Sequence, residues 1–259
     1  MHAPHSAIRD DPALPYHLRW VWDGTAPDDR HVLVRCYHGL GDTLQFARFL
    51  PALAARAASV TFEVQPRLAC LFGDFPVRVV PFDPARPHPP AEVNIESMEL
   101  APALGIAPAE APPAWLHRPA FHLPPGTIGL CCRTGDWDPE RAIPPHLLEP
   151  LSHCRTCFSL DLGRSPLAVL NPGGCPDDIE ATAALIAGCE LVVSADTMVA
   201  HLAGALGKPA ILLLRDEPDW RWAGGSGRSE WYPDFRLIRQ PAPGAWEPAV
   251  AQLLQEIKA

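Results

Sequence analysis

The sequence predicts an α/β fold made of two parallel-sheet units, and three observations support this. Short β-branched apolar runs alternate with segments of helical period along most of the chain. The strand segments are continuous apolar runs, which is typical of parallel sheets covered on both faces. A proline-dense segment from Pro81 to Pro125 separates two such α/β runs. Because crossovers between parallel strands are right-handed, each run predicts a doubly wound, Rossmann-like lobe.

The first lobe is expected to span residues 1–122, including an irregular lead-in before Arg30 and the proline-rich linker. Its first strand is predicted at His31–Cys36, followed by a glycine turn and a helix from Asp42 to Arg56, in which Pro51 is expected to cause a kink. The remaining segments are strands over 60–64 and 77–80, a short helix over 67–72, an apolar interruption of the proline segment at 93–95, and a short helix over 97–104.

The second lobe is expected to span residues 123–259 and to open with a strand over 127–132. From Gln240 onward, apolar residues at helical spacing predict a closing amphipathic helix. Between these ends the pattern predicts a helix near 145–151, a strand over 158–160, a helix over 179–187 and a strand-helix-strand unit over 191–214.

The unit over 191–214 is the most informative part of the chain. A β-branched run enters a small polar turn, and an Ala/Leu-rich helix that starts near Asp196 or Thr197 follows and ends at Gly207. Ser194, Asp196, Thr197 and His201 all fall at the carboxyl end of the strand, where ligands of parallel sheets collect. Because the first N–H groups and the positive dipole end of the helix lie there, we expect a phosphate or diphosphate site.

Composition limits the classes of partner. The chain has 259 residues, 47% of them hydrophobic, which is ample for buried cores. A formal charge of -9 without a long basic run argues against a nucleic-acid or anionic-membrane surface. The amino-terminal residues lack the pattern of a signal peptide, and no apolar run approaches the ~20 residues of a membrane span. We therefore expect no transmembrane segment and a cytoplasmic location.

The eight cysteines allow two interpretations. Cys154 and Cys157, with Cys175 and Cys189 downstream, could form a four-thiolate metal site. The second pair lacks Cys-x-x-Cys spacing, so the preferred interpretation is reduced thiols on apolar runs, with no metal and no cofactor.

A glycine turn at Gly39-Leu40-Gly41-Asp42-Thr43 lies between the first strand and its helix. Glycines permit a tight turn and the close approach of a ligand. The motif lacks the Lys of a phosphate-binding loop and the third Gly of a dinucleotide fingerprint. Asp42 is either a helix N-cap or a general base facing the crevice.

Several motifs occur in matching order and carry a family resemblance. They are Gly39 to Pro51, Val64-Gln65-Pro66, Arg141 to Pro144, Ser194 to Pro209, and Pro218-Asp219-Trp220-Arg221-Trp222. Together they closely resemble the glycosyltransferase modules fused to tetratricopeptide repeats in bacteria, which are similar to the heptosyltransferases of glycosyltransferase family nine. The resemblance runs from about Trp20 to the carboxyl end.

The resemblance implies a GT-B-like fold, with two Rossmann-like lobes facing a central cleft. It also implies inverting, metal-independent transfer of a sugar from a nucleotide-diphosphate donor to an acceptor hydroxyl, of hexosyl or heptosyl type. By motif position Asp42 matches the catalytic base, and Arg141 falls where heptosyltransferases use a Lys to bind phosphate. We expect donor-binding residues at Arg133, Thr134, Arg141, Ser194, Asp196, Thr197, Met198, Val199 and His201, and acceptor-side residues at Gly39, Gly41, Thr43, Gln45, Asp219 and Trp220.

Other interpretations stay open. Asp136-Trp137-Asp138 offers the paired acidic residues of metal-dependent glycosyltransferases, although a solvated turn fits that loop better. His201 fits a packed helix residue as well as a ligand, and Trp220 and Trp222 fit a loop anchor as well as a stacking surface. The loop over 133–142 departs from the family pattern, which supports an inactive binding protein as a second hypothesis. An epimerase or hydrolase on this fold is the third.

The sequence leaves the sugar, the nucleotide and the acceptor open. A glycan, a lipid-linked glycan and a protein are all candidate acceptors. The sequence does not determine the oligomeric state.

Overall fold

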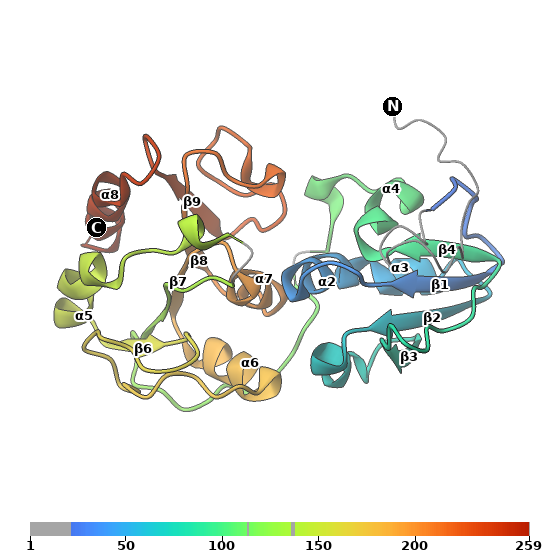
Figure 1. The fold of residues 1–259 in the computed structure, drawn as a ribbon, viewed down its shortest axis with the longest axis horizontal. Coiled ribbons are helices and arrows are strands. Elements are labelled where there is room, and N and C mark those ends of the chain that lie inside the picture. The colour runs from blue at the N-terminus through green and yellow to red at the C-terminus, as the bar shows by residue number, and fades with distance from the viewer. Residues whose placement is uncertain (1–21, 113, 136–137, 259) are drawn as a thin grey trace. The chain divides into compact units, whose positions relative to one another are not determined.

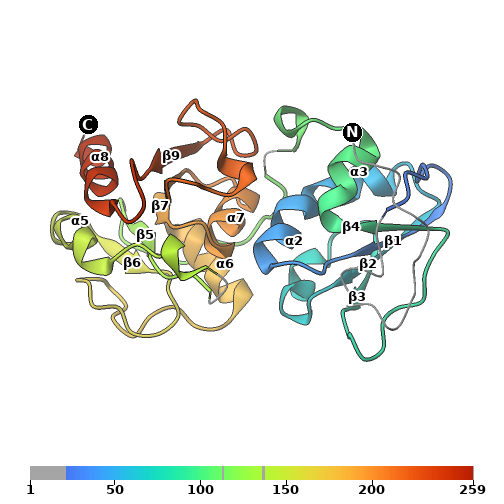
Figure 2. The same ribbon diagram turned by 45° about the horizontal axis from the view of Figure 1, so that its top comes forward.

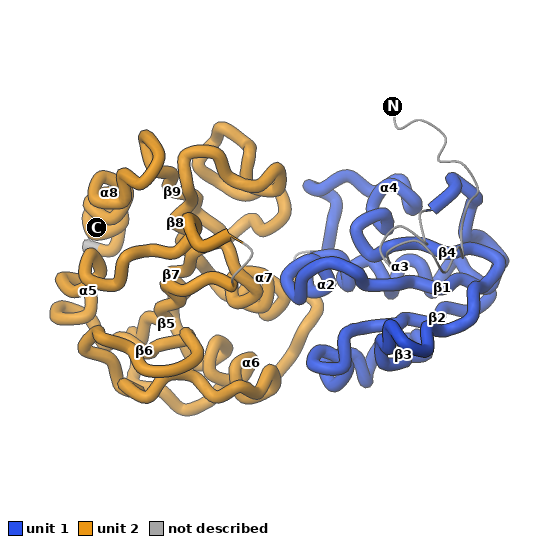
Figure 3. The backbone as a smooth tube through the Cα atoms, in the orientation of Figure 1, with its two compact units in different colours: residues 1–112 blue, residues 113–259 orange. Residues whose placement is uncertain are grey.

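The computed structural model describes residues 22–112, 114–135 and 138–258. The chain forms two compact units, Met1–Pro112 and Pro113–Ala259, which Figure 3 shows in different colours. Among the described residues, unit 1 contains a four-stranded sheet and unit 2 a five-stranded sheet, and all paired strands are parallel. The predicted α/β class with two Rossmann-like parallel sheets is confirmed.

Unit 1 has the sheet order β3-β2-β1-β4. From β1 the chain winds to β2 and β3 on one side and then to β4 on the other, so the switch point lies between β1 and β4. The elements are β1 (His31–Arg35), α2 (Leu40–Phe46), α3 (Leu50–Ala54), β2 (Ser59–Val64), β3 (Arg78–Pro81), β4 (Val93–Glu96) and α4 (Leu100–Leu104), with 3-10 turns at Ala47–Phe49, Pro66–Phe72, Ser97–Glu99 and Pro108–Glu110.

Two details of unit 1 differ from the sequence prediction. The helix expected over 42–56 is divided into α2 and α3 by the 3-10 turn Ala47–Phe49. The division lies just before Pro51, which has no N–H to continue the helical ladder. The apolar residues 93–95, noted only as an interruption of the proline segment, belong to β4, which pairs with β1.

Unit 2 has the sheet order β6-β5-β7-β8-β9, with its switch point between β5 and β7. The strand β9, an edge strand beside β8, was missed in the sequence. The elements are β5 (Ile128–Cys131), α5 (Glu149–Cys154), β6 (Cys157–Ser159), α6 (Ile179–Gly188), β7 (Leu191–Ser194), α7 (Met198–Ala205), β8 (Ala210–Leu214), β9 (Phe235–Arg239) and α8 (Trp246–Lys258), with 3-10 turns η5 (Pro139–Arg141), η6 (Pro145–Leu148) and η7 (Trp220–Trp222).

Helices cover both faces of the unit 2 sheet. Figures 1 and 2 show α5 and α8 on one face and α6 and α7 on the other. The core under α5 and α8 joins Leu151 and Leu253 to the strand residues Leu130, Val193 and Leu213. The continuous apolar strand pattern therefore reflects burial on both sides, as expected for a parallel sheet.

The boundary between the units lies before the predicted one at 122/123. The N–H groups of Trp115 and Leu116 both donate to the Ala205 carbonyl at 2.9 Å, and Phe121 N–H donates to Ala184 at 2.8 Å. The end of the proline-rich segment is thereby attached to α7 and α6 of unit 2. The density of prolines predicts a linker, but the sequence does not show which unit the end of this linker contacts.

In the described part of the chain, no helix has both the length and the apolarity needed to cross a membrane. The longest of these helices, α8, has 13 residues.

A substitution at Gly204 tests the packing of α7 against Tyr232. A Cβ atom at this position would overlap the buried ring of Tyr232. We expect Gly204→Ala to lower the free energy of unfolding by about 1–3 kcal/mol through overpacking, despite a helix propensity gain of about 1 kcal/mol. Gly225→Ala, where the added atom meets nothing within 4 Å, is the control and should change stability little. Urea unfolding followed by tryptophan fluorescence measures both, and equal stabilities would contradict this packing.

Candidate functional site

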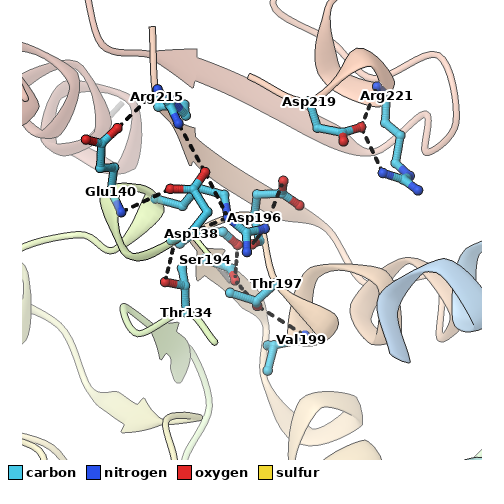
Figure 4. Close-up of polar contacts among 12 residues, drawn as sticks. Thr134, Asp138, Glu140, Ser194, Asp196, Thr197, Val199, Arg215, Asp219 and Arg221 are labelled. Atoms are coloured by element: carbon cyan, nitrogen blue, oxygen red, sulfur yellow. Dashed lines mark hydrogen bonds and ion pairs between the residues drawn. The ribbon is translucent and has the colours of Figure 1, made fainter. Parts of the chain in front are cut away.

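The turn between β7 and α7 brings the hydroxyl groups of Ser194 and Thr197 together at the carboxyl edge of the unit 2 sheet. Thr197 is the N-cap of α7, and its Oγ1 accepts the Val199 N–H at 3.2 Å. The hydroxyls of Ser194 and Thr197 lie 3.3 Å apart, and Cys131 Sγ from the neighbouring strand lies 3.6 Å from Thr197 Oγ1. Figure 4 shows this start of α7. Thr197 is a good N-cap because its hydroxyl satisfies an otherwise orphaned helix N–H.

Arg141 is held against this turn. Its Nη1 donates to the Asp196 carbonyl at 2.9 Å and lies 3.4 Å from Asp196 Oδ2. The side chains of Arg141 and Asp196 are only 17% and 13% exposed. A partly buried guanidinium therefore lies beside the positive end of α7, where both attract anions.

A second set of contacts fixes the loop that carries Arg141. Asp138 caps η5, accepts a hydrogen bond from Arg215 Nη1 at 3.1 Å and lies 3.6 Å from Arg141 Nε. Thr134 Oγ1 donates to the Asp138 carbonyl at 3.1 Å, and Arg215 Nη2 lies 3.2 Å from Glu140. Figure 4 shows these links among Thr134, Asp138, Glu140 and Arg215. Asp138 is therefore tied to arginines as part of the loop. Asp136 and Trp137 lie outside the described residues.

Asp196 has a raised pKa, and burial is the main cause. The Trp222 indole and the Arg141 guanidinium oppose this rise by favouring the carboxylate, whereas nearby Asp219 adds to it. Perturbed carboxyls in a pocket are characteristic of functional sites.

Asp219 belongs to the same place. Together with Arg141, Asp196 and Arg215 it lines a small pocket. Its carboxylate caps η7 and pairs with Arg221 at 2.8 Å. Trp220 is 54% exposed, with the Arg221 guanidinium 4.9 Å from its ring, whereas Trp222 is fully buried. Each of the two predicted interpretations therefore fits one tryptophan. Trp222 fits the loop anchor, and Trp220 fits the exposed stacking surface.

His201 lies beneath the turn, in the core. It is 4% exposed, its Nδ1 is 2.9 Å from Tyr232 Oη, and its ring stacks on Trp222. The structure therefore agrees with the packed helix residue and corrects the expectation of a donor-binding side chain. The remaining predicted residues of the turn, Met198 and Val199, are half-buried and buried.

Arg133 is also placed differently from the prediction. Its guanidinium donates to the carbonyls of Leu162 at 3.2 Å and Arg164 at 2.9 Å. Asp161, which the sequence did not single out, accepts the backbone N–H groups of Cys132 and Arg133 at 3.0 and 2.8 Å. Arg133 thus links two loops. Its described hydrogen bonds do not join it to Arg141, Asp138 or Asp196.

In unit 1, Asp42 lies in the first turn of α2 and not at its N-cap. Gly39 is the N-cap, and its N–H donates to Asp42 Oδ2 at 2.8 Å. A Cβ on Gly39 would lie 3.2 Å from that carboxylate oxygen, which is a tight contact, so a glycine favours this close approach. Gly41 lies inside the helix. Asp42 is half-buried at the switch point of the sheet.

Two predicted acceptor-side residues point into unit 1. Gln45 is fully buried, and Thr43 is 1% exposed with its hydroxyl donating to Gln65 Oε1 at 2.9 Å. Gln65 in turn donates to the His38 carbonyl at 3.1 Å. Thr43 and Gln65 therefore position the loop before α2, and the structure buries both predicted acceptor-side residues inside unit 1.

Glu96 is a residue that sequence reasoning missed. It ends β4 beside β1, 6% exposed, and accepts hydrogen bonds from Met98 N–H at 2.7 Å and Ser97 Oγ at 2.9 Å. Burial raises its pKa to about 7, and the charges of Glu99 and Asp42 add to the rise. The available signal was an acidic residue directly after the apolar run 93–95.

The cysteines are all free thiols, six of them buried and Cys70 and Cys154 exposed. Cys175 Sγ contacts Thr182 Oγ1 at 3.4 Å, and Cys189 Sγ donates to Leu185 at 3.3 Å. Among the described residues, no group of three or more His, Cys, Asp or Glu side chains is arranged to hold a metal.

Comparison with known proteins confirms the family resemblance. The sequence model of Glycosyltransferase family 9 (heptosyltransferase) matches residues 176–231, which include β7, the Thr197 turn, α7 and η7. Protein FlbA of Caulobacter vibrioides is 25% identical over 287 residues, covering 92% of this chain and 48% of that protein. The chain thus spans about half the length of this curated relative.

Solved structures share the fold. Escherichia coli heptosyltransferase WaaC with ADP-2-deoxy-2-fluoro heptose is 16% identical, with a TM-score of 0.56 over 88% of this chain and 99% of that chain. The family 9 glycosyltransferase from Veillonella parvula is 13% identical, with a TM-score of 0.55 over 90% of both chains. At these identities the likeness establishes the heptosyltransferase-like GT-B fold.

Glu96 gives unit 1 a specific pH dependence. Its pKa is about 7 in the folded protein and 4.5 ordinarily, so the folded state holds the proton more tightly between these values. Stability should therefore fall as pH rises from about 4.5 to 7, by on the order of 3 kcal/mol. Urea unfolding followed by NMR signals of β1 and β4 measures this slope.

Glu96→Gln should remove the pH slope, because the amide does not titrate. The exposed Glu110→Gln is the control and should keep it. A wild-type stability that is flat or rising over this range would contradict the assignment.

Proposed function

We propose that this chain transfers a sugar from a nucleotide-diphosphate donor to an acceptor hydroxyl, with inversion and without a metal ion. The observation that carries the proposal is the Thr197-capped start of α7 with Arg141 held against it, 2.9 Å from the Asp196 carbonyl. That turn lies inside the stretch matched by the glycosyltransferase family 9 model.

Unit 2 would bind the donor diphosphate. The helix N-terminus, the Thr197 hydroxyl and the Arg141 guanidinium supply hydrogen-bond donors and positive potential where negative charge develops on the leaving group. A cationic side chain in this role takes the place that a metal ion has in metal-dependent transferases. Asp196 and Asp219, which line the same pocket, would accept hydrogen bonds from hydroxyl groups of the sugar.

Unit 1 would supply the base. The acceptor oxygen attacks the anomeric carbon, the bond from that carbon to the diphosphate oxygen breaks, and the acceptor proton passes to the Asp42 carboxylate. The nucleoside diphosphate leaves as an anion. Attack opposite the leaving group inverts the anomeric centre.

The donor to test first follows from a relative. The WaaC structure contains an ADP-heptose analogue. ADP-heptose and other nucleotide sugars are therefore the first donor panel. Glycans, lipid-linked glycans and proteins form the acceptor panel.

Replacing Asp42 tests the base. Asp42→Asn keeps an acceptor oxygen for the Gly39 N–H but removes the carboxylate, so transfer should fall about 10²- to 10⁴-fold. Asp74→Asn, at an exposed position of the same unit, is the control and should retain transfer. Release of nucleoside diphosphate with and without acceptor is the measurement. Unchanged turnover in Asp42→Asn would refute the role of base, and turnover that needs no acceptor would favour the hydrolase or epimerase alternative.

Substitutions of two arginines test whether Arg141 binds the donor diphosphate, with Arg133, which links two loops, as the control. Arg141→Met removes a charged hydrogen-bond donor beside α7 and should weaken nucleoside diphosphate binding about 10- to 100-fold. Arg133→Met removes the described contacts to the carbonyls of Leu162 and Arg164 and should leave nucleoside diphosphate binding unchanged. Isothermal titration with ADP, UDP and GDP measures both. No binding of any of them to the wild type would favour the inactive binding-protein alternative.

A further inference from the structure

A polar cavity of about 400 Å³ lies in unit 2 beyond the carboxyl ends of β8 and β9. Its polar lining comes from Glu140, Arg215, Asp216 and Gln240, and Gly244 and Trp246 also line it. This volume is within the range of about 300–1,000 Å³ typical of small-molecule sites. The Thr197 turn does not line the cavity, and of the motifs that carry the family resemblance only Arg141 to Pro144 contributes to its described lining, through Ala142.

Gln240 carries a buried donor without a partner. The residue is 4% exposed, and its Oε1 accepts the Gly244 N–H at 2.9 Å. That bond fixes the amide so that Nε2 is the other polar end, and Nε2 has no hydrogen-bond partner among the described residues. Buried amide groups are nearly always paired, so this one indicates a missing acceptor.

Arg215, which also lines this cavity, carries a second such donor. Its two Nη atoms pair with Asp138 at 3.1 Å and Glu140 at 3.2 Å. Its Nε is buried and, within the described part of the chain, has no partner. Two unpartnered N–H donors on residues that line one cavity point to a ligand with acceptor oxygens.

The charges of the lining residues indicate which class of oxygen-containing ligand fits the cavity. Glu140 and Asp216 contribute two carboxylates, and the single guanidinium of Arg215 is already shared with Asp138 and Glu140. A phosphate would meet net negative charge, and a cation would face the unpartnered N–H groups. A neutral hydroxyl both accepts from an N–H and donates to a carboxylate, so it matches both kinds of group.

We propose that this cavity is a carbohydrate-binding site, which takes a neutral, hydroxyl-rich sugar residue between the Gln240 amide, Arg215 and the Asp216 carboxylate. The site adjoins the diphosphate site at the start of α7, because Arg215 lines both pockets, but Gln240 and Asp216 line this cavity and not the small pocket beside Asp196. It does not rest on the proposed function, because sugar binding is measured without any transfer.

The test uses the full chain and the methyl glycosides of glucose, galactose and mannose, with inorganic phosphate as the anionic comparison. We expect at least one glycoside to shift the NMR signal of the Trp246 indole, with an affinity in the millimolar range. The signal is identified as the one that Trp246→Phe removes. No shift with any glycoside, or a shift with phosphate alone, would overturn the proposal.

Variants then locate the binding. Gln240→Glu keeps an acceptor for the Gly244 N–H but removes the Nε2 donor, and it should weaken glycoside binding at least about tenfold. Gln255→Glu makes the same change at an exposed position on α8 and should bind like the wild type. Equal binding by Gln240→Glu and wild type would refute the site.

A further variant covers the case in which Gln240→Glu does not fold. A nucleotide titration distinguishes a failure of this proposal from a failure of the proposed function. If Gln240→Glu does not fold, Asp216→Asn, which removes the carboxylate acceptor, should weaken glycoside binding in its place. Gln240→Glu should bind nucleoside diphosphates as tightly as the wild type. A wild type that binds glycosides but no nucleotide would contradict the proposed function and leave this site standing.

Discussion

Both units depend on one constraint, which is that parallel strands place all their carboxyl ends at the same edge of the sheet. In unit 2 this edge joins the loop after β5, which carries Arg141, to the turn after β7, which carries Thr197. In unit 1 it joins the loop before α2 to the end of β4, where Glu96 lies. In each unit these are the two strands at the switch point of the winding. Residues far apart in the sequence therefore meet because of strand order alone.

This constraint explains how much the sequence could predict. The Thr197 turn and the helix after it were predictable, because a β-branched run, a small polar turn and a helix-ending Gly207 are local signals. Strand β9 was missed because Arg236 is exposed between buried Phe235 and Leu237, so this edge strand does not have the continuous apolar pattern of the others. Strand β4 has only four residues inside a proline-rich segment, and only its pairing with β1 identifies it.

The same limit applies to the site residues. Local sequence patterns predict where a residue lies along the chain, but its side-chain partners come from distant segments. Motif position put Arg141 and Asp196 in one predicted site, and the structure brings them together because they lie in the segments that follow the neighbouring strands β5 and β7. It could not distinguish Arg141 from Arg133, since the carbonyls that bind Arg133 come from the loop after β6. Helical position alone put His201 near the ligand edge, but its partner Tyr232 lies 31 residues away. Side-chain direction is set by tertiary contacts that local patterns do not contain.

The charged groups of the two units differ in what they contribute. In unit 1, Arg35 and Glu63 form an ion pair at 2.9 Å with both side chains 1% exposed. Both also bind His88, so the pair attaches the proline-rich loop to the sheet. Removing one partner of such a buried pair costs about 3–5 kcal/mol, which makes the pair a fixed part of the fold.

In unit 2, the pairs of Arg215 with Asp138 and Glu140 involve side chains that are 28%, 19% and 76% exposed. Exposed pairs contribute about 0–1 kcal/mol each, so they set the position of the Arg141 loop without adding much stability. Such contacts exchange at little cost for contacts to a ligand. The fold is therefore rigid where unit 1 anchors its loop and adjustable where unit 2 would meet its ligands.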